Sequence, residues 1–426
     1  METKATSSPA QILDILRDNL EGCFHSTPLI MSILASQRFK AGGDFNSWLG
    51  KHAETISHEG QTYYSIPPVY THRTETLKRK VERAKNASKI LPRTVLISFV
   101  SIFDSFIYGL IRSFLILKPE ILNCEQKQIP LSELKNFSNF NEIREHILEQ
   151  EIEEMMRGSH SDHIQWIEKI FNIDLKSIIN SWEKFIEITE RRNLYVHSDG
   201  IVNKQYMSIC KKNEVDLQET QLGTELEVSR AYLKESLDCL LETSVAIQQA
   251  LWRKIFPKNE NQLEEADKSL INITYSLILN GEYLLAQKVL LNAQKNIRKY
   301  RSEANRLTNI INLAQTYYHL GDKDSCIEIL EKIDWSACQD KYKLCYCVLT
   351  ENYDEASGIM KKIGNPEDLD INYNEWPIFK NFRENDLFFS TYKSIFGKDP
   401  NHLEIPEEAQ LERKNWNKML SFIEEK

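Results

Sequence analysis

The chain has 426 residues, 41% of them hydrophobic, with 14 glycines and 12 prolines. This composition favours globular domains with ordinary packed cores and excludes long low-complexity linkers. The formal net charge of −9 at pH 7 excludes the broad basic surface with which some proteins coat nucleic acid. Any contact with a polyanion is therefore expected to be local.

The cysteines and the first residues bear on the cellular compartment. Eight cysteines are scattered along the chain, with no Cys-x-x-Cys pair and no nearby histidine at zinc-ligand spacing. A chain of this size does not need disulfides, so the thiols are expected to be reduced. Residues 1–10 lack the charged and then apolar pattern of a secretory signal. These features predict a cytoplasmic protein.

The N-terminal part begins with residues 1–70, in which Trp48 and the segment 63–70 suggest a packed extension of unknown role. The stretch 71–93 that follows is basic. Two interpretations of it remain open: a solvated helix face, or a local RNA-binding face for which Lys78, Arg79, Lys80 and Arg83 are the candidates. The only acidic residues of this stretch are Glu75 and Glu82. The basic residues are Arg73, Lys78, Arg79, Lys80, Arg83, Lys85, Lys89 and Arg93.

Residues 95–117 are apolar except for Asp104, Arg112 and a few small polar residues, and the stretch is long enough to cross a bilayer. Each of the two charges would cost about 2.5–3.5 kcal/mol near the centre of a membrane helix. We therefore expect a buried central helix and no membrane contact. Asp104 is predicted either to point toward a functional site or to pair with Arg112 or a helix cap.

A possible metal cluster follows, formed by His146, His160 and His163 with Asp162. Because residues 160–163 immediately precede an apolar helical run, Ser161 or Asp162 is better explained as a helix N-cap. The acidic run 142–154 is typical of a solvated helix face. The chain also lacks a glycine-rich phosphate loop and a Gly-x-Ser-x-Gly elbow. No metal and no cofactor are expected.

The segment 190–200, with the sequence Glu-Arg-Arg-Asn-Leu-Tyr-Val-His-Ser-Asp-Gly, is the strongest functional signal. Apolar residues recur at helical spacing over 177–196, which predicts a helix that ends near His197 with Gly200 as its stop. Arginine grips phosphate, and histidine exchanges protons near neutral pH. RNA cleavage needs a base for the 2′-hydroxyl, a cation for the phosphorus oxygens and an acid for the leaving oxygen.

The helical spacing indicates how these groups are arranged. Asn193 and His197 share one face, whereas Arg192 lies about 140° away from His197 around the helix. One chain therefore has difficulty bringing the arginine and the histidine together. Two copies packed about a twofold axis would place two of each in a single cleft, which supplies both a base and an acid.

This pattern resembles the HEPN superfamily, whose ribonucleases carry an arginine, usually followed by a polar residue, and then a histidine after four to six positions. Arg192, Asn193 and His197 match it with four intervening residues. The resemblance covers roughly residues 71–256, and helical stretches precede and follow the motif in the order of a HEPN bundle.

The resemblance implies a homodimer that cleaves RNA without a metal, often leaving a 2′,3′-cyclic phosphate. It further implies that Arg192 stabilises the phosphorane, His197 acts as base or acid and Asn193 positions the phosphate. Arg191 also has an acceptable spacing, and Asp104 is a possible supporting residue. HEPN proteins associated with sensor modules commonly act as toxins or in anti-phage defence, and tRNA or mRNA is the substrate implied.

Three alternatives remain open. His197 could cap its own helix while Arg192 pairs with Glu187 or Glu190 on the surface. The chain could instead be a non-catalytic scaffold whose bundle dimerises and whose repeats recruit a partner. It could also be a dormant toxin, blocked by a partner or by tyrosine modification near the motif. The position where some toxins carry that tyrosine, two residues after the histidine, holds Asp199 here.

From residue 266 onward the pattern changes to paired short helices. Hairpins are predicted over 272–294, 307–333 and 344–363, with turns at Gly281, Gly321 and Asn352, spaced by 40 and then 31 residues. They resemble degenerate tetratricopeptide repeats, which stack into a surface for a protein or peptide partner. A structural prop for the bundle is the alternative interpretation.

The sequence thus predicts an all-α fold with four parts. An N-terminal extension spans 1–70, a HEPN-like bundle 71–256, a short α-solenoid of tetratricopeptide-like hairpins 262–364, and a helical C-terminal cap 365–426 that ends in a charged helix over 407–426.

Overall fold

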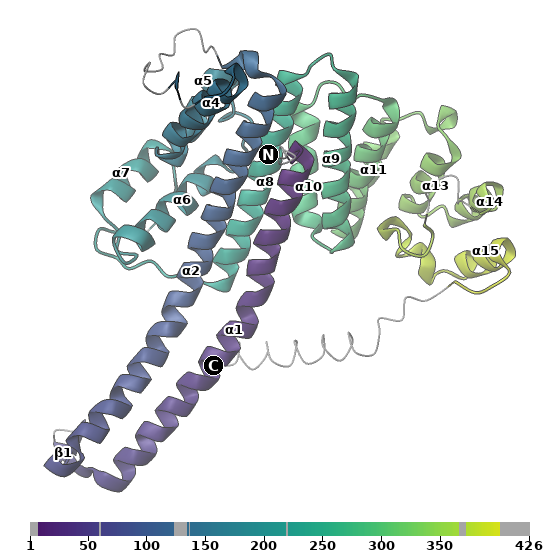
Figure 1. Cartoon of the computed structure of the whole chain (residues 1–426). Coiled ribbons are helices and arrows are strands. Elements are labelled where there is room, and N and C mark those ends of the chain that lie inside the picture. The colour runs from purple at the N-terminus through teal and green to yellow at the C-terminus, as the bar shows by residue number, and fades with distance from the viewer. Residues whose placement is uncertain are drawn as a thin grey trace. The chain divides into compact units, whose positions relative to one another are not determined.

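The computed structural model describes residues 7–58, 61–122, 134–135, 137–218, 220–365 and 372–400. Over this part of the chain the fold is all-α, as predicted, with 14 α-helices and one two-stranded hairpin (Figure 1). The predicted helix 407–426 lies outside the described residues. The first elements in order are α1 (Pro9–His52), β1 (Glu54–His58), β2 (Gln61–Ser65), η1 (Pro68–Tyr70), α2 (Thr71–Leu117), η2 (Pro119–Ile121), α4 (Phe140–Met156), α5 (His160–Phe171), α6 (Trp182–His197), α7 (Lys204–Lys212) and α8 (Arg230–Ile255).

The remaining elements are α9 (Glu260–Leu279), α10 (Tyr283–Asn296), α11 (Glu303–His319), α12 (Lys323–Glu331), η4 (Trp335–Ala337), α13 (Asp340–Leu349), α14 (Tyr353–Ile363), η5 (Pro377–Phe379), η6 (Phe382–Glu384) and α15 (Asp386–Phe396). The helices pack into two units. The motif unit contains Leu16–Asp104 and Glu183–Leu240, and the repeat unit contains the described residues of Met1–Ile15, Ser105–Trp182 and Leu241–Gln410. Helices α1, α2 and α8 contribute residues to both.

In the motif unit, α1 and α2 run side by side and are joined by the β1–β2 hairpin (Figure 1). We call residues 27–95 the arm. Residues less exposed than their neighbours recur every three or four positions on α2, and on α1 at the same spacing except for one interval of seven, which fits a coiled-coil seam. At the far end Trp48 Nε1 donates to Thr74 Oγ1 (3.0 Å) and its ring stacks on His52. The seam residues are Thr27, Met31, Leu34, Ala41, Phe45 and Trp48 on α1, and Thr74, Leu77, Val81, Ala84, Ser88, Leu91 and Val95 on α2.

The second half of α2 is the predicted buried helix. Leu96, Phe99 and Val100 are fully buried in the motif unit, and Leu110 and Phe114 are fully buried in the repeat unit. By length and composition alone, the stretch Pro68–Leu117 could span a membrane, and half of its most apolar part is buried in the protein. A core helix has these same properties.

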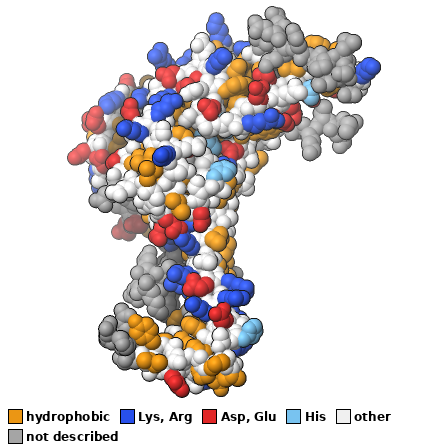
Figure 2. Space-filling model, turned by 90° about the vertical axis from the view of Figure 1, so that its left-hand side faces the viewer, with side chains coloured by type: hydrophobic (Ala, Val, Ile, Leu, Met, Phe, Trp, Pro, Cys, Tyr) orange, Lys and Arg blue, Asp and Glu red, His pale blue; other side chains and the backbone are white. Residues whose placement is uncertain are grey.

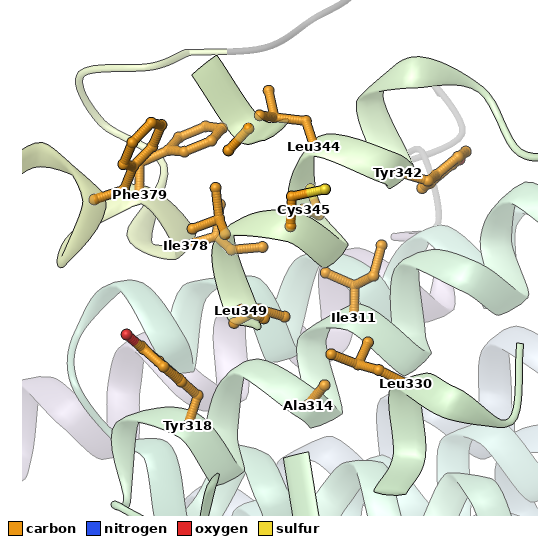
Figure 3. Close-up of a cluster of buried hydrophobic side chains, with 14 of the residues drawn as sticks. Ile311, Ala314, Tyr318, Leu330, Tyr342, Leu344, Cys345, Leu349, Ile378 and Phe379 are labelled. Atoms are coloured by element: carbon orange, nitrogen blue, oxygen red, sulfur yellow. The ribbon is translucent and has the colours of Figure 1, made fainter. Parts of the chain in front are cut away.

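In the repeat unit, helices α9 to α14 form three hairpins with the predicted turns, but the first hairpin begins at Glu260 rather than at residue 272. Gly281 and Gly321 adopt φ of +79° and +86°, which glycine allows without strain. The Asn352 side chain caps α14 by accepting a hydrogen bond from the Glu355 N–H. The last two hairpins share a hydrophobic core with η5, η6 and α15 (Figure 3). Its fully buried aromatic residues are Phe379, Phe382 and Phe388.

Two further helix starts differ from the sequence-based predictions. Helix α6 begins at Trp182 rather than at residue 177, because the Asp174 carboxylate accepts the Ser177 N–H (3.1 Å) and holds that segment in turns. Helix α5 is capped by Ser159 rather than by Ser161 or Asp162. Asp162 is the third residue of that helix, and its side chain completes a capping box with Ser159.

A buried ion pair fixes the junction of α8, α9 and α11. The fully buried Asp267 carboxylate accepts hydrogen bonds from Arg253 Nη2 (2.6 Å), the Arg301 backbone N–H (2.7 Å) and Asn305 Nδ2 (3.0 Å). Both carboxylate oxygens are used, so the charge is compensated. Removing the carboxylate would leave the largely buried Arg253 without its counter-ion.

We predict that Asp267→Ala lowers the free energy of unfolding by about 3–5 kcal/mol, as for other broken buried ion pairs. Urea unfolding followed by circular dichroism measures this. Glu260→Ala is the matched control, because Glu260 contacts Arg301 (2.9 Å) with a side chain that is 71% exposed. That control should change the free energy by less than about 1 kcal/mol. Equal losses in both variants would contradict a special role for Asp267.

Candidate active site

The candidate site lies in the motif unit, at the C-terminal end of α6. As predicted, the helix ends at His197 and the chain turns at Gly200. Leu194 C=O accepts hydrogen bonds from the N–H groups of Ser198 (2.8 Å) and Gly200 (3.1 Å). Asp199 and Gly200 have φ of 50° and 80°. A left-handed C-cap of this kind satisfies the last carbonyls of the helix and reverses the chain.

Arg93 on α2 holds this turn. Its guanidinium donates to Asp199 O (3.2 Å) and Oδ1 (3.1 Å) and to the Glu225 carboxylate, and it lies 5.0 Å from the centre of the Tyr195 ring. The Arg93 side chain is 8% exposed. Its predicted place among the surface cations of 71–93 is therefore wrong. It was missed because a buried arginine is unusual unless it is paired, and its partners lie more than 100 residues away.

The residues after the motif complete a frame around the turn. The Val202 N–H donates to Thr224 O (2.9 Å), and the Leu226 N–H donates to Gly200 O (3.0 Å). Tyr195 Oη also donates to Leu226 O (2.8 Å). Glycine is needed at position 200, because a Cβ there would lie 2.6 Å from Tyr195 Cε1.

Arg191 is committed to a structural network. Its Nε donates to Glu187 Oε1 (2.6 Å), its Nη1 donates to Glu227 O (3.2 Å), and its guanidinium lies 4.1 Å from the centre of the Tyr232 ring. Tyr206 and Tyr232 donate to the two Glu187 oxygens at 3.1 and 2.7 Å. This arginine pairs with Glu187, which the sequence had suggested as a partner for Arg192.

Burial and neighbouring charges together raise the pKa values of four side chains around this network. Burial, and then the Glu187 carboxylate, raise the pKa of both Tyr206 and Tyr232, so these phenols stay neutral. Burial alone would lower the pKa of Arg191, but Tyr232 and Glu187 outweigh it and raise that pKa. Burial also raises the pKa of Tyr195 to about 12, against the opposing effect of the two nearby arginines. The groups titrate far from neutral pH, which suits a structural role.

Arg192 has looser partners than Arg191. Its Nη2 donates to Asp104 Oδ2 at 3.4 Å, and its Nη1 donates to Asn193 Oδ1 at 3.1 Å. Nε has no acceptor among the described residues. Asp104 therefore contacts the motif, while Arg112, the other predicted partner, pairs with Glu149 (3.1 Å). The structure thus joins three predicted site residues: Asp104, Arg192 and Asn193. Asn193 Nδ2 also reaches Glu190 (3.4 Å).

His197 lies apart from this cluster. It is the last residue of α6, its side chain is exposed, and it makes no hydrogen bond or ion pair with the residues described. Arg192 is partly buried beside Asp104. The two motif residues therefore present their polar groups in different directions on one chain, as their helical spacing predicts.

The other predicted site residues fall elsewhere. Lys78, Arg79, Lys80 and Arg83 are exposed on the arm. In the repeat unit, the rings of His160 and His163 lie 5.1 Å apart and are buried, and the Asp162 carboxylate accepts hydrogen bonds from Ser159 N (2.9 Å) and Oγ (2.6 Å). Asp162 is thereby committed to the helix cap.

Comparisons of the chain with protein-family models, with curated proteins and with solved structures found no match.

We predict that Gly200→Ala destabilises the protein more than Gly223→Ala. Both glycines have φ above +79°, where an alanine costs about 1–2 kcal/mol, but a Cβ at position 223 would meet no atom within 4 Å. Only the Gly200 substitution also displaces the Tyr195 ring. Urea unfolding of both variants measures the difference. Equal destabilisation would show that the ring does not constrain this turn.

Proposed function

We propose that this protein is a metal-independent endoribonuclease whose site is completed by a second copy of the chain. The base takes the proton of a ribose 2′-hydroxyl, and the 2′-oxygen bonds to phosphorus. The 5′-oxygen then leaves with a proton from the acid, which yields a 2′,3′-cyclic phosphate and a 5′-hydroxyl. His197 of one copy is the base and the same histidine of the other copy is the acid.

The contrast between Arg191 and Arg192 is the observation that carries the proposal. Arg191 is held by the Glu187 carboxylate through Nε, by a backbone carbonyl through Nη1 and by an aromatic ring. Arg192 has a long contact to Asp104, and its Nε has no acceptor among the described residues. A partly buried arginine with unused donors is suited to bind the phosphorus oxygens, where charge develops in the transition state.

The separation of Arg192 and His197 supports the second copy. On a single helix, residues five positions apart lie about 140° apart, so the histidine and the arginine do not converge on one phosphate. A twofold axis near the end of α6 would bring the histidine of each chain to the arginine of the other. Asp104 would orient the guanidinium, and Asn193 would position the phosphate beside it.

The repeat unit is suited to regulate this activity. The ends and outer faces of its hairpins expose several large hydrophobic residues: Leu279, Leu284, Leu291, Leu320 and Ile327. Exposed apolar groups on stacked helical hairpins are typical of surfaces that bind a protein or peptide partner. The repeats would hold that partner, and the enzyme would act as a toxin or a defence effector released by a signal.

A non-catalytic scaffold is the second candidate, and one observation favours it. The Asp104 carboxylate already partly neutralises Arg192 in the isolated chain. If the pair is permanent, the motif stabilises α6 against α2 and the chain recruits a partner that carries the activity.

The test uses purified wild-type and His197→Ala protein, incubated with total cellular RNA and with tRNA in EDTA. General acid–base groups contribute about 10²–10⁴-fold, so the variant should cut at least about 100-fold more slowly. The fragments of the wild type should end in 2′,3′-cyclic phosphates. His25→Ala is the control, because His25 is an exposed histidine on α1 of the same unit. It should cut like the wild type.

Two outcomes would go against the proposal. Equal cutting by wild type and His197→Ala would assign the activity to other groups. If no protein cuts, and co-expression with partner genes or phage infection also gives no His197-dependent cutting, the scaffold is the better explanation.

A further inference from the structure

The arm concentrates positive charge in an acidic protein. Residues 38–85 contain nine lysines and arginines against five aspartates and glutamates, whereas the whole chain has a net charge of −9. Lys78, Arg79, Lys80, Arg83 and Lys85 are all exposed. Figure 2 shows lysine and arginine side chains gathered along this part of the molecule.

The exposed cations follow α2 toward the candidate site, and we call Lys78 to Lys89 the basic row. They cover about 16 Å of α2 at the helical rise and, at about 100° per residue, are spread around the faces of the helix other than the seam. At the end of the row Lys89 pairs with Glu225, which also holds Arg93. Arg93 in turn contacts Asp199, two residues after His197. The basic row therefore ends beside the turn that follows the motif, where the carboxylates of Glu225 and Asp199 neutralise the buried Arg93.

The other end of the arm carries exposed aromatic and aliphatic groups. Ile56 and Tyr63 are paired across the β-hairpin and are 51% and 52% exposed. Tyr64, on the opposite face of the hairpin, is 54% exposed, and Val69 is 80% exposed. Hydrophobic side chains accordingly cluster at this end in Figure 2. Tyrosine rings beside cations can stack on unpaired bases.

We propose that the arm binds the RNA substrate outside the cleavage site, so that the enzyme acts best on RNA long enough to reach from His197 to the tip. This inference rests on the proposed function and names its substrate class. The helix from Arg93 back to Thr71 spans about 33 Å. A stacked strand needs about 10 nucleotides to cover that distance at about 3.4 Å each. The row binds phosphates, and the tip stacks on bases.

An anionic membrane is the alternative partner for a surface of cations and apolar groups. A bilayer touched by the tip would meet the arm end on, and apolar groups at such surfaces penetrate only about 5–10 Å. The row runs along the helix, so most of its cations would then lie beyond one Debye length, about 8–10 Å, from the lipid. An extended polyanion can follow the whole row, which favours RNA.

The test measures binding by fluorescence anisotropy with 2′-O-methyl oligonucleotides of about 5 and about 20 nucleotides, chosen to be shorter and longer than the arm requires. These RNAs lack the attacking hydroxyl, so binding is read without cleavage. One variant of the full chain carries Lys78→Gln, Arg79→Gln and Arg83→Gln, and a second carries Tyr63→Ser and Tyr64→Ser. The control carries Lys288→Gln, Lys295→Gln and Arg298→Gln, which removes three exposed cations of the repeat unit.

For the long RNA, the lysine–arginine variant should bind at least about 10-fold more weakly at low salt, and its logarithmic salt slope should fall by about 2, or 0.7 per lost phosphate contact. The tyrosine variant should also bind more weakly with an unchanged slope, while the control matches the wild type. The short RNA should not distinguish the variants.

Three results would overturn the inference: equal losses in the arm variant and the control, equal binding of both lengths by the wild type, or arm-dependent binding of phosphatidylserine vesicles without binding of RNA. Arm-dependent binding without cleavage of natural RNA would keep this inference and reject the nuclease. Cleavage without arm-dependent binding would do the reverse.

Discussion

One buried cation determines the geometry of the motif unit. Arg93 joins α2 to the turn after α6 and to the segment around Glu225, and among the described residues of the motif unit no other arginine is as deeply buried. A buried guanidinium is tolerated only when its donors are paired, so Asp199 and Glu225 are constrained to their positions. The turn at Gly200 then follows, because Tyr195 fills the space between Arg93 and the turn. These contacts also fix the position of the candidate site, because His197 is the last helical residue before the turn.

Two adjacent arginines have acquired different roles because a helix rotates by about 100° per residue. Arg191 faces the interior formed by Glu187, Tyr206 and Tyr232, where both carboxylate oxygens are already used. Arg192 faces α2, where Asp104 offers one distant oxygen. The first arginine is fixed by a short ion pair with Glu187, and the second makes only a long contact with Asp104. Arg191 therefore stabilises the packing of α6, while Arg192 is available to bind a substrate. This explains how a motif can be embedded in a helix without destabilising it.

Periodicity predicted most of the fold. The three hairpins of the repeat unit and the end of α6 carry strong helical patterns with glycine or asparagine at their turns, and these turns lie where expected, although the first hairpin begins at Glu260 rather than at residue 272. The arm was not predicted. Its seam uses Ala41, Ala84 and Ser88, which give little hydrophobic contrast, so α1 leaves only a faint periodic signal. Within the site, the contact of Asp104 with Arg192 joins residues 88 positions apart, and a sequence pattern carries no distances of that kind. The start of α6 was misplaced because a local Asp174 turn overrides the apolar periodicity.

The charge distribution constrains how a polyanion could approach such a protein. Most of the chain is acidic, and at physiological ionic strength repulsion between exposed charges is screened beyond about 8 Å. A phosphate backbone therefore experiences attraction only close to exposed cations, which outnumber the acidic residues in the arm. Because Lys89 and Arg93 share Glu225, the basic row ends beside the turn that carries His197, where the carboxylates of Glu225 and Asp199 neutralise the buried Arg93. An RNA captured along α2 would be held within reach of the motif before any chemistry, so capture and cleavage would be separable properties.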